Sequence, residues 1–259
     1  MTSEFEFRDL LRLIEERSRA FRSAVSTADA LDVQVPTCPD WTLLDLVHHL
    51  GTGRRSWAAT VAAGPDATAR VPAPTGGHEA APSEPEALDA WLAVSTEQLV
   101  QALREAGAER ACWTWWGDSQ SPQTCGAVAR HQLQEITVHA YDAQITAGAP
   151  QPLPDDVALD GVEEFLSTCC ATTSAWPHEP AVVDYVATEG RAWRQWVDAD
   201  GSRYAPLEST HVVEAPADAR LTGSASDVVL VLYGRRPLDS LTLEGDREVF
   251  DRLVAWEPE

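Results

Sequence analysis

Three side chains in this sequence combine the residue types and the spacing of a metal site. His49 falls on the apolar stripe of residues 42–63, which repeat with helical periodicity, and that stripe predicts a buried face. Glu135 and His139 are four residues apart in a second helical stretch, residues 124–147, so they project from one face of that helix. Two imidazoles and a carboxylate, with a fourth position left open, suit a catalytic zinc site. The pattern therefore predicts a metal centre between two facing helices of a bundle.

Spacing alone leaves plainer alternatives open for these residues and their neighbours. A histidine on an apolar stripe is more often a hydrogen-bonded core residue than a ligand, and a Glu/His pair at this spacing is more often a surface pair. Asp142 follows His139 by about one helical turn, and it could either orient a ligand histidine or remain a solvated carboxylate at the helix end. His131, one turn before Glu135, could be a further polar group of the site or a structural residue.

The tryptophans and cysteines give weaker signals. A tryptophan-rich connection could line a pocket or belong to the core, and it contains Trp113, Trp115 and Trp116. The cysteines lack a CxxC spacing and a base placed beside them, so we expect reduced packing residues of a cytoplasmic protein: Cys38, Cys112, Cys125, Cys169 and Cys170. The sequence opens on acidic residues, without the basic and then apolar order of a signal peptide, which supports the same compartment.

The charge balance excludes several classes of function. The 259 residues carry 19 basic and 41 acidic side chains, for a net charge of −22, and every basic residue is an arginine. Without lysine, Schiff-base chemistry, a P-loop lysine and a pyridoxal phosphate anchor are all excluded. A chain of this charge is a poor partner for nucleic acid. No apolar run approaches the roughly 20 residues that span a bilayer, so we expect no membrane partner.

The elements that would hold these side chains change character near residue 150. Before it, apolar spacings of three and four predict four helices, at about residues 5–28, 42–63, 85–106 and 124–147. Thr42 and Asp45 form a capping-box pattern at the start of the second helix. After it we expect a helix at about 156–172, β-like runs at 181–188, 192–198, 210–215 and 219–223, an apolar segment at 226–233 that fits either helix or strand, a short run at 241–243 and a helix at about 246–256.

The predicted fold class is therefore α+β with two domains. Residues 1–150 form a helical bundle, and residues 151–259 form an α+β domain after a proline-rich boundary. The 44% apolar fraction is enough for a core in each of them, and a monomer fits this layout.

Three separated segments resemble one known family. VPTCPDWTLLDLVHHLGTGRRSWA (residues 35–58) is similar to the first signature of the mycothiol-dependent maleylpyruvate isomerase family, and HQLQEITVHAYDAQ (residues 131–144) is similar to its second. ADARLTGSASDVVLVLYGRRPLDSLTLEGD (residues 217–246) resembles the C-terminal domain of that family. Asp40 departs from the pattern, because many relatives have glycine before the tryptophan. It lies in a predicted loop, and we expect no effect on the metal ligands.

The resemblance implies a fold, a ligand set and cofactors. It implies a DinB-like four-helix bundle that binds a metal, followed by a small α/β domain similar to sterol-carrier folds. It places the family's metal ligands on His49, Glu135 and His139. It places a functional arginine of the second domain on Arg235, with Arg236 as the neighbouring alternative. It also implies mycothiol as thiol cosubstrate and a divalent metal; zinc is favoured, while iron, nickel and cobalt accept the same donors.

The activity that the resemblance implies is isomerisation of a small cis-enoic diacid. A metal-activated thiolate would add to the double bond, and rotation followed by elimination would leave the trans isomer. Arg235 could pair with a substrate carboxylate if the two domains close over one cleft. Two alternatives stay open: a mycothiol S-transferase that stops at the adduct with another electrophile, and a non-enzymatic, metal-stabilised protein that binds a ligand. An acidic surface repels a dianion, so a neutral electrophile fits better if the arginines face away.

Overall fold

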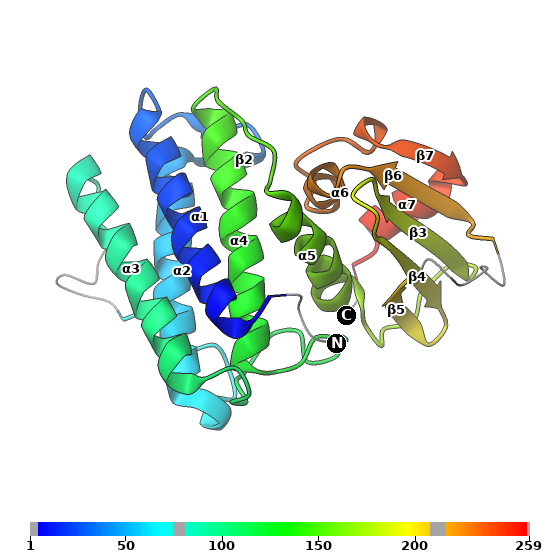
Figure 1. The fold of residues 1–259 in the computed structure, drawn as a ribbon, viewed down its shortest axis with the longest axis horizontal. Coiled ribbons are helices and arrows are strands. Elements are labelled where there is room, and N and C mark those ends of the chain that lie inside the picture. The colour runs from blue at the N-terminus through cyan, green and yellow to red at the C-terminus, as the bar shows by residue number, and fades with distance from the viewer. Residues whose placement is uncertain (1–4, 75–80, 208–215, 258–259) are drawn as a thin grey trace. The chain divides into compact units, whose positions relative to one another are not determined.

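The structure, a computed structural model, describes residues 5–74, 81–207 and 216–257. The chain divides into two compact units, Met1–Trp115 with Gln123–Pro152 and Trp116–Pro122 with Leu153–Glu259. Helices make up most of the first unit, and the second combines helices with a sheet (Figure 1). The predicted fold class, α+β with two domains, is confirmed.

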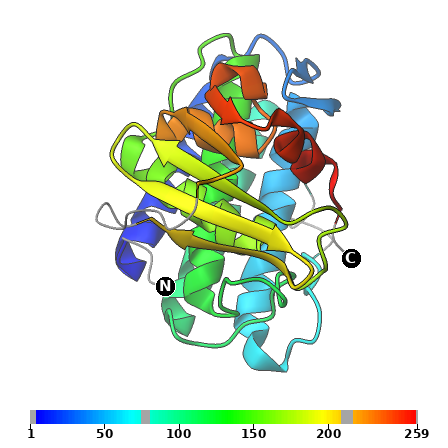
Figure 2. The ribbon, with the colours of Figure 1, turned by 90° about the vertical axis from the view of Figure 1, so that its right-hand side faces the viewer.

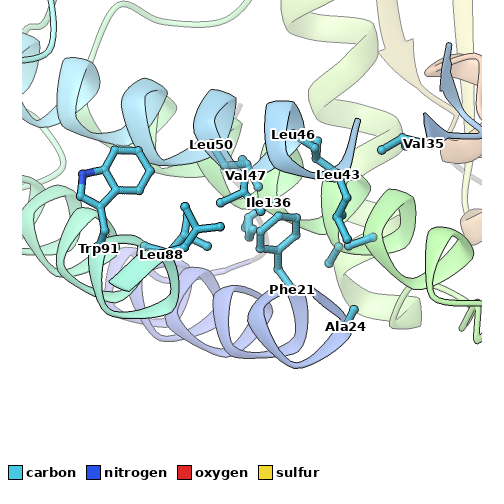
Figure 3. Packing of buried hydrophobic residues seen from close by; sticks show 13 residues of the cluster. Phe21, Ala24, Val35, Leu43, Leu46, Val47, Leu50, Leu88, Trp91 and Ile136 are labelled. Carbon is cyan, nitrogen blue, oxygen red and sulfur yellow. The ribbon is translucent and has the colours of Figure 1, made fainter. Parts of the chain in front are cut away.

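Four long helices form the first unit: α1 Phe7–Thr27, α2 Leu43–Ala63, α3 Pro85–Ala106 and α4 Cys125–Thr146. Helix α1 packs along α4, and α2 packs along α3. Buried side chains from all four helices meet in one core, shown in Figure 3, where Phe21 of α1 lies among residues of the others. A small hairpin, β1 Gln34–Val35 and β2 Cys38–Thr42, precedes α2 in a segment that the sequence indicated only as a link.

The predicted capping box at the start of α2 is confirmed. The Thr42 backbone N–H donates to Asp45 Oδ2 at 2.9 Å, and the Asp45 backbone N–H donates to Thr42 Oγ1 at 3.2 Å. Because these bonds satisfy N–H groups that have no partner inside the helix, they define its first residue as Leu43. The cap therefore sets where His49 stands along the helix.

Replacing Gly51 with Ala is expected to destabilise the bundle. A Cβ at Gly51 would lie 1.9 Å from Cζ3 of Trp91, a buried ring of α3, so α2 and α3 would have to separate. We expect a loss of about 1–3 kcal/mol in the free energy of unfolding, measured by urea denaturation. Gly53→Ala is the control, because its Cβ would meet nothing closer than Arg70 at 3.6 Å and should be neutral or slightly stabilising. Equal midpoints for Gly51→Ala and the unmodified protein would contradict the packing.

The second unit is built on a five-stranded sheet with the order β5-β4-β3-β6-β7. Its strands are β3 Ala181–Ala187, β4 Ala192–Asp198, β5 Gly201–Pro206, β6 Ala219–Gly223 and β7 Thr242–Gly245. Among the described strands of this sheet, β3 and β6 pair in parallel and the other neighbours pair antiparallel. Figure 2 shows these strands side by side. The helices of this unit are α5 Asp155–Phe165, which continues into a π-helical turn at Leu166–Cys170, α6 Ala225–Leu232 and α7 Arg247–Ala255.

In the second unit, the structure decides one open alternative and adds one strand that the sequence did not predict. Residues 226–233, which fitted helix or strand, belong largely to α6, whose Ser224 side chain accepts from the Asp227 backbone N–H. Strand β5 was not predicted, and the strand expected at 210–215 lies outside the described residues. Within residues 5–74, 81–207 and 216–257, no helix is both long enough and apolar enough to cross a membrane.

Candidate metal centre and its cavity

The three side chains that the sequence singled out lie together. His49, Glu135 and His139 each offer one ligand atom, and these atoms all lie within 4.8 Å of one another. His49 Nε2 is 2.9 Å from Glu135 Oε1, and His139 Nε2 is 3.5 Å from the same oxygen. Two imidazole nitrogens thus converge on one carboxylate oxygen. The chemistry of this donor set, two nitrogens and an oxygen from α2 and α4, fits a divalent metal such as zinc.

The prediction that His49 faces the core is wrong. Its side chain is 39% exposed, although the stripe of α2 on which it was placed is largely apolar. The neighbouring His48 is half-buried instead, and its Nε2 donates to the Pro82 carbonyl oxygen at 2.9 Å. His49 is exposed because it lines a cavity beside Glu135 rather than packing in the interior.

Asp142 is a buried hydrogen-bond partner of His139. Its carboxylate has no exposed surface, and it accepts a hydrogen bond from His139 Nδ1 at 2.8 Å and another from Thr37 Oγ1 at 2.6 Å. The alternative of a solvated carboxylate at the helix end is therefore wrong. Because Nδ1 donates its proton to the hydrogen bond with Asp142, Nε2 is the ring nitrogen that faces Glu135 and is available as a metal ligand.

Burial and charge oppose each other at Glu135 and His139. Burial alone would raise the pKa of Glu135, but the charge and hydrogen bond of His139 and the hydrogen bond of His49 hold it well below its usual range. Burial alone would lower the pKa of His139, but Glu135 and Asp142 outweigh it and raise that pKa to about 9. Without a metal, His139 is therefore an imidazolium at neutral pH, with both ring nitrogens protonated. A metal must displace the proton on Nε2 in order to bind there.

A second group of ligand-type residues shares His139. Cys38, on β2, lies 3.7 Å from Asp142 Oδ2, and the ligand atoms of Cys38, His139 and Asp142 also lie within 4.8 Å of one another. We favour the first group, because Asp142 already accepts from His139 and from Thr37 and because neither His139 nor Asp142 is exposed. The sequence indicated Cys38 only as a packing residue, and its proximity to Asp142 depends on the β1–β2 hairpin.

A cavity of about 170 Å³ adjoins the triad in the helical unit. His49 and Glu135 form part of its wall, and among its other lining residues are His131, Trp57 and Trp115. The ring of His131 lies edge-on to both tryptophans, with centroid distances of 6.5 and 5.7 Å. The prediction that the tryptophan-rich connection could line a pocket thus holds for Trp115, which is 51% exposed.

The remaining tryptophans of that connection lie elsewhere. Trp113 packs on Trp57, with ring centroids 6.2 Å apart. Trp116 is buried in the second unit, where its Nε1 donates to the Pro122 carbonyl oxygen.

Three residues at the site were not predicted from the sequence. Trp41, at the end of β2, lies tilted against the rings of His49 and His139, with ring centroids 4.6 Å and 6.2 Å away. Arg54 of α2 and Arg70 of the following loop also line the cavity. The signal for Trp41 was its place just before the helix cap, and the signal for Arg54 was an arginine on an apolar stripe.

Arg235 and Arg236 follow the C-terminal end of α6 in the second unit. The Arg235 backbone N–H donates to the Leu230 carbonyl oxygen, and its side-chain Nη1 donates to the Tyr233 carbonyl oxygen at 2.8 Å. Arg236 forms an ion pair with Asp227 of α6, so its charge is used within its own unit. The assignment of Arg235 as the functional arginine, with Arg236 as the neighbouring alternative, stays a prediction.

Comparison with known proteins identifies the family. Residues 11–144 match the mycothiol maleylpyruvate isomerase N-terminal domain family, and residues 156–252 match the MDMPI C-terminal domain family. This chain belongs to the mycothiol maleylpyruvate isomerase family. The resemblance that the three sequence segments indicated is confirmed, and both of the family's domains are present in order.

Two solved structures have a similar fold to this member of the mycothiol maleylpyruvate isomerase family. They are crystal structures of the mycothiol-dependent maleylpyruvate isomerase and of its histidine-to-alanine mutant. Each is 15% identical to this chain with a TM-score of 0.59, and the match covers 94% of this chain and 96% of that chain. No curated protein matches the chain in sequence. At this identity the two structures support the shared fold, and the activity of this chain has to be argued from its own site.

Proposed function

We propose that this protein is a metal-dependent enzyme that uses mycothiol as cosubstrate to isomerise a cis double bond in a small electrophile. One observation carries the proposal: two imidazole nitrogens converge on one carboxylate oxygen at the wall of a cavity. Structural zinc sites are closed by four protein ligands, whereas catalytic sites use three and keep a position open. The cavity gives an incoming thiol group access to that side of the triad.

Each side chain of the site has a defined task in this proposal. His49, Glu135 and His139 would hold the metal, for which zinc is our first choice. When bound, a divalent metal would lower the pKa of a thiol, ordinarily about 8.5, so that a thiolate is present at neutral pH. Asp142 holds His139 in the tautomer that directs Nε2 toward Glu135. Trp41 lies beside both imidazole rings and would restrict their rotation.

The reaction needs no net oxidant and no net proton. The thiol sulfur would form a bond to one alkene carbon, and the π electrons would move onto the conjugated carbonyl group. Rotation about the resulting carbon–carbon single bond precedes loss of the same sulfur, which restores the double bond in the trans form. By family resemblance, Arg235 is our proposed second-domain residue for a substrate carboxylate, because a guanidinium pairs with it through two hydrogen bonds.

The proposal is tested by following substrate and thiol together. Full-length protein loaded with zinc is incubated with mycothiol and maleylpyruvate, and both are quantified over many turnovers. We expect the double bond to isomerise while the thiol concentration stays constant. Loss of one thiol per product would show an S-transferase instead. No reaction of either kind by zinc-loaded protein would contradict the proposed enzyme with this substrate.

We further propose that the protein works in the cytoplasm. All five cysteines are free thiols in the structure, which fits a reducing compartment and a thiol cosubstrate. Fractionation of the source cells tests this, and recovery of the protein outside the cytoplasmic fraction would contradict it.

A further inference from the structure

A buried arginine lines the cavity without a full set of hydrogen-bond partners. Arg54 of α2 is only 2% exposed. Its Nη1 donates to Thr96 Oγ1 at 2.5 Å, and this hydroxyl in turn donates to the Leu92 carbonyl oxygen. Its Nη2 is buried and has no hydrogen-bond partner within the described part of the chain. Such orphaned donors are uncommon in native proteins and costly, so a partner supplied by a ligand is the first explanation to consider.

Arg54 keeps its charge in this environment. Burial lowers its pKa to about 10, an effect that Glu135 opposes and Arg22 reinforces. That value is still well above neutral pH, so the guanidinium is protonated. No carboxylate lies within ion-pair distance of Arg54 among the described residues, where its one side-chain partner is the neutral Thr96. A buried cation without a close counter-ion attracts an anion from solution.

A second arginine, Arg70, adds positive charge to the lining of the cavity. Arg70 reaches the cavity from the loop after α2, where its Nε donates to Ser56 Oγ at 2.9 Å. Its guanidinium lies 5.6 Å from the centre of the Trp57 ring, which also lines the cavity. Among the described residues, the lining contains two guanidinium groups and one carboxylate, that of Glu135, in a chain whose net charge is −22. The charge of the cavity lining is therefore opposite in sign to the net charge of the whole chain.

We propose that Arg54, with Arg70 as a second cation, binds a carboxylate of the substrate, so that this site takes an anionic electrophile. The inference rests on the proposed function and adds to it the side chains of the helical unit that would recognise the substrate carboxylate. An arginine fork suits the task because it donates two parallel hydrogen bonds to one carboxylate. Nη2 of Arg54 is the donor that a carboxylate oxygen would satisfy.

The chain offers a matched control at the next position. Arg55 is also buried on α2, and its Nε donates to Ser95 Oγ of α3 at 2.8 Å, much as Arg54 donates to Thr96. Arg55 stacks on Trp91 and does not line the cavity. Loss of a buried arginine from α2 is thus common to both variants, whereas loss of a cavity cation is specific to Arg54.

The test uses maleate as a dianionic probe and its diamide, maleamide, as an uncharged one. Binding to full-length, metal-loaded protein is measured by calorimetry, with metal content and thermal unfolding recorded for every variant. We expect Arg54→Met to weaken maleate binding by about 10- to 100-fold, as loss of charge-assisted hydrogen bonds predicts, and to leave maleamide binding and metal content unchanged. Arg55→Met should bind maleate like the unmodified protein. In turnover, Arg54→Met should raise KM for an anionic substrate more than it lowers kcat.

Two further variants separate the arginine site from the metal and from folding. His49→Ala removes a proposed metal ligand, and maleate binding should persist in it if the arginines hold the carboxylate. Arg54→Lys keeps the charge, and Arg70→Met removes an exposed residue, so both remain informative if Arg54→Met does not fold; each should weaken maleate binding several-fold. Equal maleate affinity in folded Arg54 variants, or binding lost only with His49, would overturn the inference. Failure of the proposed metal site would appear separately, as missing metal.

Discussion

Protein carrying His49→Ala is expected to lose its metal and its activity together. His49 is one of only three proposed ligands, and its Nε2 stands 2.9 Å from the carboxylate oxygen at which the triad converges. Loss of an outer partner of a metal ligand already costs about 10- to 100-fold in affinity, and loss of a ligand itself should cost more. Metal content after gel filtration, with activity measured on the same sample, checks the prediction.

Two control variants make that result specific. His48→Ala removes the adjacent histidine, whose described hydrogen bond goes to the Pro82 carbonyl, and it should keep the metal. Cys38→Ala removes a member of the alternative group around His139, and it should also keep the metal. Metal retained by His49→Ala but lost from Cys38→Ala would assign the centre to Cys38, His139 and Asp142 instead.

The Asp142→Asn variant is expected to bind metal about 10- to 100-fold more weakly while remaining folded. Asp142 accepts the Nδ1 proton of His139 at 2.8 Å, which directs Nε2 toward Glu135. An asparagine can turn its NH₂ toward Nδ1 and stabilise the opposite tautomer, in which Nε2 carries the proton and cannot bind a metal. Competition with a chromophoric chelator measures the affinity.

Thr37→Val is the matched control for Asp142. The Thr37 hydroxyl donates to Oδ1, whereas His139 donates to Oδ2, so the valine variant removes a partner of Asp142 but leaves the histidine bond. Its metal affinity should fall much less than that of Asp142→Asn. If the two variants lose affinity equally, the role of Asp142 is general packing rather than control of the His139 tautomer.

The proximity of the three proposed ligands could be predicted from the sequence in part, because some of their geometry is local. A spacing of four residues places Glu135 and His139 on one face of α4 whatever the rest of the chain does. The capping box of α2 is equally local, since it depends on Thr42 and Asp45 alone. Spacing suggested the pairing of His49 with α4, and the family resemblance strengthened it, because no local pattern specifies which helices face each other.

The residues that the sequence did not reveal depend on contacts between distant segments. The β1–β2 hairpin is short, and its value to the site comes from Thr37 reaching Asp142, which lies 105 residues away. Strand β5 begins at Gly201, whose φ of 114° suits a turn, and its pairing with β4 is what makes it a strand. Neither the hairpin nor β5 has a periodic pattern of apolar residues from which it could have been predicted.

Arg54 illustrates a signal that was present but weak. It continues the buried stripe of α2 formed by Leu46, Leu50, Trp57 and Val61, at helical spacing from each. A charged residue on such a stripe indicates either a buried polar network or a ligand site. The structure adds three observations that periodicity cannot supply. Nη1 of Arg54 donates to Thr96, Nη2 has no hydrogen-bond partner among the described residues, and a cavity lies alongside.

The most direct test of a metal centre open to thiol is a spectrum of the cobalt-substituted protein. Cobalt replaces zinc in sites of this donor type, and a thiolate bound to it produces an intense near-ultraviolet band. Titration with mycothiol is predicted to produce that band with one thiol per metal, in the unmodified protein and not in His49→Ala. A cobalt spectrum that does not change when mycothiol is added would contradict the account, because the metal would then have no position for the thiol.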